Sequence, residues 1–232
     1  MAEHRPNISV DTDTRSTPID AITHGQTTIS NKCVAEGVDL NVRSTEGPSY
    51  LMLAVLSRQT ESVKALIHGG VDINAQRDDG MSPLHVASSE GFTDIVPILL
   101  DHGADIETID SFGRTPLFNA ACSGRHDVVQ FLIDRGANVN TANRDSQIAL
   151  TAACEPGQLD VVSLLLDNGA EINYKDKDGV TPLYYAALQG HIDAIRMLLA
   201  RSADVNSATN DSNWNMTAVG RTILDYDVIT IW

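Results

Sequence analysis

The chain has 232 residues and a formal net charge of −15, because 31 Asp and Glu residues outnumber 16 Lys and Arg residues. The chain has only four lysines and no basic run, so it lacks the clustered positive charge that binds nucleic acid phosphates without sequence specificity. The same acidity argues against binding to an anionic membrane surface, so we expect neither partner. No stretch approaches the roughly 18–20 apolar residues of a membrane-spanning helix. Aromatic residues make up only 5% of the chain, so the apolar 42% is mainly small or aliphatic, which suits thin layers of stacked helices.

The N-terminal region shows no repeated pattern. We expect residues 1–12 to be disordered. The segment 1–7 lacks the apolar core of a signal peptide, so we predict an intracellular protein, cytoplasmic or alternatively nuclear. Its three cysteines are then thiols in a reducing compartment. Because no Cys-x-x-Cys pair is present, we predict no metal site and no cofactor.

A 33-residue period follows. Gly47, Gly80, Gly113 and Gly179 fall in one register, and Ser146 stands where the fourth of five glycines would be. A tripeptide that begins two residues after each of these positions repeats with them: Ser49-Tyr50-Leu51, Ser82-Pro83-Leu84, Thr115-Pro116-Leu117, Ile148-Ala149-Leu150 and Thr181-Pro182-Leu183. A third repeated segment reads Gly-Val-Asp-Ile-Asn in its first copy and occupies residues 70–74, 103–107, 136–140, 169–173 and 202–206. A period of this length indicates a repeat array.

One unit, residues 77–109, predicts two short helices followed by an extended return. Ser82 is suited to cap the first helix, and Pro83 fits its opening position because it has no amide hydrogen to lose. Gly91 should end this helix after Glu90. Apolar residues at spacings of three and four then predict the second helix, in which Pro97 lies among the early turns and should cause a slight distortion.

The first helix of this unit reads Ser82-Pro83-Leu84-His85-Val86-Ala87, and the units that begin at 110 and 176 are similar. A 33-residue unit with this motif resembles the ankyrin repeat. The resemblance implies an all-α ankyrin-repeat solenoid of paired antiparallel helices joined by β-hairpin loops. It also implies that His85 is structural, with its imidazole bonded to the hydroxyl of Ser82.

The period divides the chain into about six repeats and an irregular C-terminal segment. A degenerate repeat with a polar second helix occupies 13–43 and is expected to cap the array. The full repeats are predicted at 44–76, 77–109, 110–142, 143–175 and 176–208. Residues 209–232 are expected either to cap the last repeat or to begin a truncated seventh one.

The candidate catalytic and metal-binding motifs are better explained as structural parts of the repeat than as functional sites. Residues 176–179 resemble the start of a calcium loop, but Ala187 stands where the bidentate glutamate should be. His126 and His191 each lack a second imidazole within one or two helical turns. Because the sequence also has neither a phosphate-binding glycine loop nor a nucleophile elbow, we predict no enzyme activity and no catalytic residue.

The resemblance instead implies a protein-binding surface, because in ankyrin arrays the hairpin tips and the exposed side of the first helices line a concave groove. The variable positions of that groove predict these partner-binding residues: Asp78, Asp79, Met81, Ser89, Glu90, Ser111, Phe112, Arg114, Ser123, Arg144, Asp145, Gln147, Glu155, Lys177, Asp178, Val180, Leu188 and Gln189. Phe112 would either anchor a partner or pack against the adjacent tip. Arg114, Arg144 and Lys177 add positive charge beside it, which favours an apolar segment that carries carboxylates.

The sequence therefore predicts a monomeric, non-catalytic adaptor or scaffold that binds another protein. Two alternatives remain open at this stage. The chain could be the regulatory or targeting fragment of a larger multidomain protein. It could also be an enzyme, or an enzyme subunit, with a small-molecule pocket in the groove.

Overall fold

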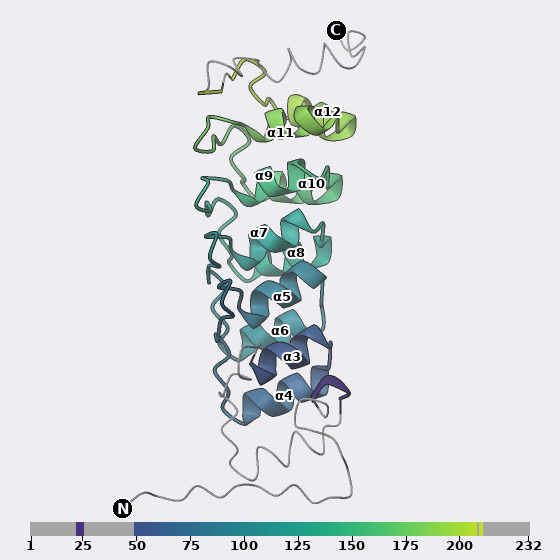
Figure 1. The fold of residues 1–232 in the computed structure, drawn as a ribbon. Helices are drawn as coiled ribbons and strands as arrows, with labels where there is room; N and C mark the ends of the chain where they lie inside the picture. The colour runs from purple at the N-terminus through teal and green to yellow at the C-terminus, as the bar shows by residue number, and fades with distance from the viewer. Residues whose placement is uncertain (1–21, 26–48, 208, 211–232) are drawn as a thin grey trace, which may run out of the picture.

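The computed structural model of the protein describes residues 22–25, 49–207, 209 and 210. Its helices form pairs stacked along one axis, and the loops between the pairs line up along one edge of the stack (Figure 1). The first helices of the pairs are α3 (Tyr50–Leu56), α5 (Pro83–Glu90), α7 (Pro116–Cys122), α9 (Ala149–Cys154) and α11 (Pro182–Gln189). The second helices are α4 (Thr60–His68), α6 (Ile95–Asp101), α8 (His126–Asp134), α10 (Leu159–Asp167) and α12 (Ile192–Ala200).

Two columns of leucine run through the core of the stack. In each column a leucine recurs every 33 residues and is at most 2% exposed: Leu51, Leu84, Leu117, Leu150 and Leu183 in the first helices, and Leu66, Leu99, Leu132, Leu165 and Leu198 in the second. Each first helix packs against the first helices of the adjacent units and against its own second helix. Because full burial of one leucine contributes about 1.5–3 kcal/mol, these columns hold each unit to its neighbours.

The first helices begin as the sequence predicts. The hydroxyl of Ser82 accepts a hydrogen bond from the backbone N–H of His85, and Pro83 is the first helical residue, which confirms both expectations. Thr115 and Thr181 cap α7 and α11 in the same way. In α9 the cap position holds Ile148, which has no hydroxyl to offer, and α9 has only six residues. The missing cap therefore coincides with the shortest first helix among the described units.

The second helix α6 departs from the regular pattern at Pro97. Gly91 ends α5 with a positive φ of 78°, as predicted. Helix α6 then begins only at Ile95 and has seven residues, whereas α8, α10 and α12 have nine. Pro97 is thus the third residue of its helix, where a backbone N–H has no intrahelical partner to lose. The expected distortion takes the form of a shorter helix.

The loops between the units are tight turns, and the described residues contain no β-strand. We call the residues between a unit's start and its first helix the tip. Each tip is closed by a backbone bond such as Asp110 N–H to the carbonyl of Arg114, at 3.1 Å. Successive tips are also joined, because the N–H of Arg144 donates to the carbonyl of Phe112 at 3.0 Å, and the same bond recurs between the neighbouring tips. The tips therefore form one continuous hydrogen-bonded edge.

Several predictions of the sequence lie outside the described residues. They are the disorder of residues 1–12, most of the capping repeat at 13–43, and the C-terminal segment after residue 210. The unit boundaries within 44–208 remain predictions.

Candidate functional site

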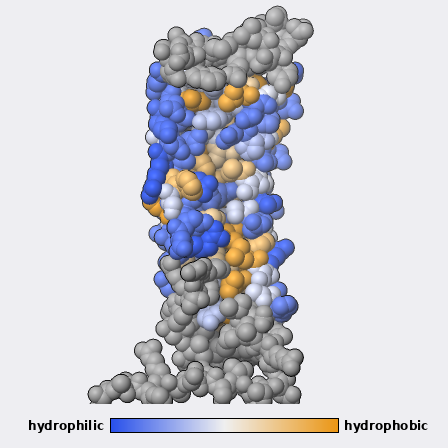
Figure 2. All heavy atoms as spheres, viewed as in Figure 1, coloured by the Kyte–Doolittle hydropathy of each residue, from blue (hydrophilic) through white to orange (hydrophobic). Residues whose placement is uncertain are grey.

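The predicted partner-binding residues lie in three places, and none of them is buried. Those in the first part of the tips are Asp78, Asp79, Ser111, Phe112, Arg144, Asp145, Lys177 and Asp178. Those in the tips directly before the helix-cap position are Met81, Arg114, Gln147 and Val180. Those at or just after the ends of first helices are Ser89, Glu90, Ser123, Glu155, Leu188 and Gln189. We call these residues together the tip surface. Figure 2 shows hydrophilic residues along the edge that the tips form and apolar residues over the helices beside it.

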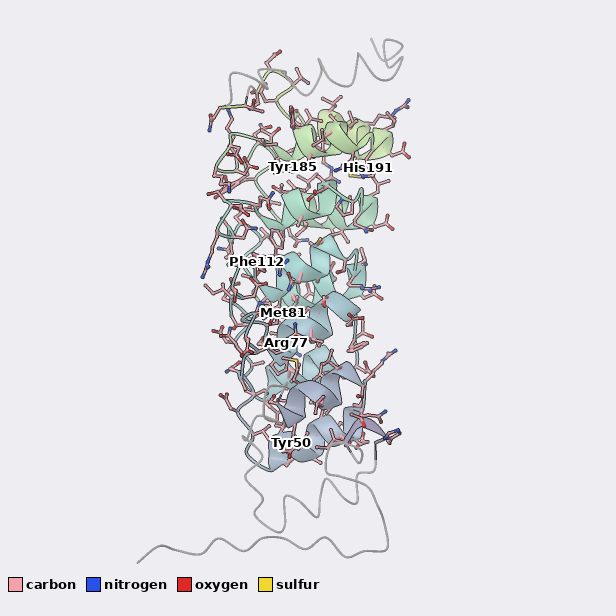
Figure 3. All side chains as sticks on the ribbon, in the orientation of Figure 1. Tyr50, Arg77, Met81, Phe112, Tyr185 and His191 are labelled. Atoms are coloured by element: carbon pink, nitrogen blue, oxygen red, sulfur yellow. The ribbon has the colours of Figure 1, made fainter. Side chains whose placement is uncertain are left out.

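Phe112 is the most prominent apolar side chain of the tip surface. It is 57% exposed, although burial of a phenyl ring is energetically favourable. Phe112 is labelled in Figure 3, and the guanidinium carbon of Arg114 lies 4.7 Å from the centroid of its ring, which is a cation–π contact. Such a contact contributes about 0.5–1 kcal/mol at an exposed site, so it favours this position of the ring without covering it.

The charge of Arg114 is balanced inside its own tip by Asp110. The carboxylate of Asp110 is buried and accepts hydrogen bonds from the backbone N–H groups of Phe112 and Arg114, at 2.8 and 2.9 Å. The guanidinium of Arg114 adds contacts of 2.7 Å from Nε and 2.6 Å from Nη2. Burial raises the pKa of Asp110, but the hydrogen bonds from Arg114 and Phe112 outweigh burial, so its pKa lies below the ordinary value. Arg114 thus shapes the tip that presents Phe112.

The other cations of the tips differ in how far they are neutralised. Lys177 Nζ lies 2.6 Å from Asp145 Oδ1 on the preceding tip. Arg77 forms an ion pair with Asp79, and this pair lowers the pKa of Asp79. The guanidinium of Arg144 is exposed and has no ion pair with any of the described residues. Of the three cations predicted to meet a partner, Arg144 therefore has the charge that remains uncompensated within the described structure.

A hollow of about 580 Å³ lies beside α11, at the far end of the tip surface. Its lining includes Val180, Leu188 and Asp178 of the predicted set, together with Tyr184 and Tyr185. The lining is mainly apolar with a few polar groups, as is usual for ligand pockets.

The sequence reasoning missed Tyr185, which joins two units at this hollow. Its hydroxyl donates to Asp176 Oδ2 at 2.8 Å and accepts from Nε2 of Gln147, 38 residues away, at 2.8 Å. Burial and the bond to Asp176 raise the pKa of Tyr185, so the phenol stays protonated near neutral pH. One signal was available, because the equivalent positions in the preceding units hold the smaller residues Val86, Asn119 and Ala152.

The ends of two first helices are fixed by side chains from the next unit. Arg125 Nε donates to the carbonyl of Ser89 at 2.8 Å, and His191 Nε2 donates to the carbonyl of Glu155 at 2.9 Å (Figure 3). Gly157 leaves room for the imidazole, because a Cβ atom there would lie 2.6 Å from the ring of His191. These contacts give His191 a structural role and hold the adjoining residues of the tip surface on rigid helix ends.

The two described cysteines are poor nucleophiles. Cys154 is fully buried, and burial raises its pKa to about 12. Cys122 is exposed, yet partial burial and the nearby carboxylate of Glu155 also raise its pKa. A thiol becomes reactive when its pKa is lowered, so neither side chain has the electrostatic setting of a catalytic cysteine. None of the described helices is long and apolar enough to cross a bilayer.

The stacked helix pairs, the repeated leucine columns and the joined tips define a helical repeat solenoid. The sequence model for ankyrin repeats matches the chain in three copies, at residues 19–110, 51–143 and 139–209. The chain therefore belongs to the ankyrin repeat family, and the prediction of an all-α ankyrin-repeat solenoid is confirmed. Ankyrin repeats generally serve as protein–protein interaction modules. A search of the curated proteins gave no match.

Proposed function

We propose that the protein is a non-catalytic recognition module, an adaptor or scaffold that binds another protein through the tip surface. The observation that carries this proposal is Phe112, an exposed ring whose position is favoured by the contact with Arg114. A ring with a preferred position offers a large contact area and loses less conformational freedom when a partner covers it. The same surface serves a free adaptor or the binding part of a larger protein.

The charge beside Phe112 indicates the chemistry of the bound segment. Arg144 lies on the next tip, and its backbone N–H donates to the carbonyl of Phe112, so the two residues are neighbours on joined tips. The chain as a whole is acidic, with a net charge of −15, and a second acidic protein would be repelled over most of its surface. A segment with an apolar side chain and an adjacent carboxylate would satisfy both Phe112 and Arg144.

The test is affinity capture from a cell lysate with the full chain as bait, beside a Phe112→Ala, Arg144→Glu variant. Arg144 is the better charge to reverse, because a glutamate in place of Arg114 would face the buried carboxylate of Asp110. We expect the variant to lose a protein that the wild type retains. The matched control is Arg196→Glu, which reverses an exposed charge on α12 outside the tip surface and should retain the protein. Identical capture by all three baits would refute the proposal.

A second candidate function rests on the hollow beside α11, whose volume of about 580 Å³ lies in the usual range for small-molecule pockets. On this alternative the protein is an enzyme, or a subunit of one, that takes a small ligand between Val180, Tyr185 and Leu188. A saturable rise in melting temperature with a small molecule, abolished by Leu188→Arg, would favour it. Capture that depends on Phe112 and not on Leu188 would favour the recognition module.

A further inference from the structure

Two histidines from adjacent units meet on the side of the stack formed by the ends of the second helices. His68 is the last residue of α4, and His102 directly follows the last residue of α6. Both side chains are exposed, and their ring centroids lie 5.7 Å apart with the planes at 73°. The sequence reasoning did not pair them, because 34 residues separate them along the chain.

Two of the three other junctions between described units have opposite charges at the equivalent positions. Arg135 Nη1 lies 2.7 Å from Asp101 Oδ1, and Arg201 Nη1 lies 2.5 Å from Asp167 Oδ1. Each of these pairs also spans 34 residues and joins the end of one second helix to the end of the next. The first described pair of units thus has two imidazoles at a place where those units have an attractive ion pair.

The hydrogen bonds of both rings fix which nitrogen is free. Nδ1 of His68 lies 2.7 Å from the carbonyl oxygen of Lys64, and Nδ1 of His102 lies 2.8 Å from that of Ile98. A carbonyl oxygen can only accept, so each Nδ1 carries the proton and each Nε2 of a neutral ring keeps its lone pair. A metal-bound histidine commonly has this arrangement, with the other ring nitrogen donating to a carbonyl. The C-terminal ends of both helices add a negative dipole that favours a cation.

We propose that His68 and His102 bind one divalent transition-metal ion, such as Zn²⁺, and thereby link two units of the array. A zinc–nitrogen bond of about 2.0–2.1 Å places each ring centroid about 3.2 Å from the ion, so a tetrahedral ion separates the two centroids by about 5.2 Å. The 5.7 Å between the two centroids in the structure is close to that value. Imidazole is a favoured ligand of zinc, copper and nickel. No group of three or more His, Cys, Asp or Glu residues gathers for a metal in the described part of the chain, so water would complete the coordination.

The test is calorimetric titration of the full chain with zinc chloride in a Cys33→Ser, Cys122→Ser background, because thiolates also bind zinc. We expect His102→Gln and His68→Gln each to weaken zinc binding at least tenfold. His126→Gln should leave it unchanged, because His126 is an exposed histidine on α8 whose Nδ1 lies 3.2 Å from the carboxylate of the adjacent Asp127. Circular dichroism would confirm that each variant keeps its helices.

A second readout follows the two imidazoles directly. In nitrogen-15 spectra of the histidine rings, zinc should shift the Nε2 resonances of His68 and His102 together, at one equivalent. Absence of zinc binding, or binding that both His68→Gln and His102→Gln leave intact, would overturn the proposal.

Discussion

His85 is a buried imidazole that joins one unit to the tip of the next. Its Nδ1 accepts from the backbone N–H of Ser82 at 3.1 Å, and its Nε2 donates to the carbonyl of Arg114 at 2.8 Å. The Ser82 hydroxyl lies 2.9 Å from the same Nδ1, so the structural role that the family resemblance implied for His85 is confirmed. Burial lowers the pKa of His85, and the Arg114 carbonyl and the Asp110 carboxylate offset only part of that effect.

This lowered pKa predicts how stability depends on pH. Below the ordinary imidazole pKa of 6.5, the unfolded chain binds a proton that folded His85 resists. The contribution of His85 is therefore complete above pH 6.5 and is lost as the pH falls toward the folded-state pKa. We expect His85→Gln to lower the free energy of unfolding by about 1–3 kcal/mol near neutral pH and to reduce its decline on acidification. Urea unfolding at about pH 7.5 and about pH 5.5 measures both effects, and equal declines in the two proteins would contradict the prediction.

Ser62 places a hydroxyl in an otherwise apolar column. The equivalent residues of the next units are Ile95, Val128 and Val161. Ser62 is fully buried, and its Oγ has no hydrogen-bond partner among the described residues. A buried hydroxyl without a partner costs about 1–3 kcal/mol, so we expect Ser62→Val to raise the free energy of unfolding by about 1–2 kcal/mol in urea.

Ser88 offers a matched control for that substitution. Its Oγ is likewise buried without a partner in the described structure, and the equivalent residues of two later units are Ala121 and Ala187. Ser88→Ala removes the hydroxyl without adding volume, so a smaller rise is expected. A loss of stability in both variants would show that the hydroxyls have partners, whereas a loss in Ser62→Val alone would show that its site has no room for the added methyl groups.

At the scale of the element, the tip at residues 143–147 contains a residue in a strained conformation. Ser146 has a φ of 57°, whereas Gly113 and Gly179 occupy the equivalent turns at 76°. A left-handed conformation costs a residue with a Cβ atom about 1–2 kcal/mol, and glycine avoids this cost. Glycine also has greater conformational freedom in the unfolded chain, which offsets part of the resulting gain in stability. We expect Ser146→Gly to raise the free energy of unfolding by about 0.5–1 kcal/mol.

The reverse change at a neighbouring tip supplies the comparison. A Cβ atom on Gly113 would lie 2.9 Å from the backbone nitrogen of Arg144, which bonds to the carbonyl of Phe112. Gly113→Ala should therefore cost more than Ser146→Gly gains, and thermal unfolding of the two variants compares them directly. If Ser146→Gly proved destabilising, the hydroxyl or Cβ of Ser146 would have to stabilise the tip in a way that φ alone does not indicate.

The local features of the elements could be predicted from the sequence, whereas the contacts between units could not. The cap at Ser82 and the end of α5 at Gly91 depend on residues a few positions apart, so the sequence pattern determines them. The bond from Gln147 to Tyr185 spans 38 residues and needs the exact stacking of two units. In the same way, the spacing of Arg114 and Asp110 gave no sign that a buried carboxylate neutralises this arginine. The position of Phe112 was predicted, but the contact that orders its ring required the structure.

At the scale of the whole molecule, stability is distributed along one axis. Each unit is held by the leucine columns, by the bonds between tips and by ion pairs such as Arg135–Asp101. The described helices of one unit pack mainly against those of adjacent units, so the array behaves approximately as a chain of nearest neighbours. Damage in the middle should therefore separate the flanking units, while damage near an end should remove only what lies beyond it.

A charge in the central core tests this view. Leu132 is fully buried in α8, and Leu132→Asp would place a carboxylate among apolar side chains, which costs several kcal/mol unless the helix opens. We expect the variant to unfold or to retain only partial arrays, with a broad or two-step urea transition and proteolytic cleavage near α8.

The matched control places the same change in the last described helix. Leu198 is equally buried in α12, at the equivalent position two units later. Leu198→Asp should unfold the last described unit and leave a cooperative transition for the units before it, because those units remain stacked on one another. A single sharp transition of unchanged midpoint in Leu132→Asp would contradict the nearest-neighbour picture. Equal losses in both variants would mean instead that the array unfolds as one cooperative body, in which position along the axis has no effect.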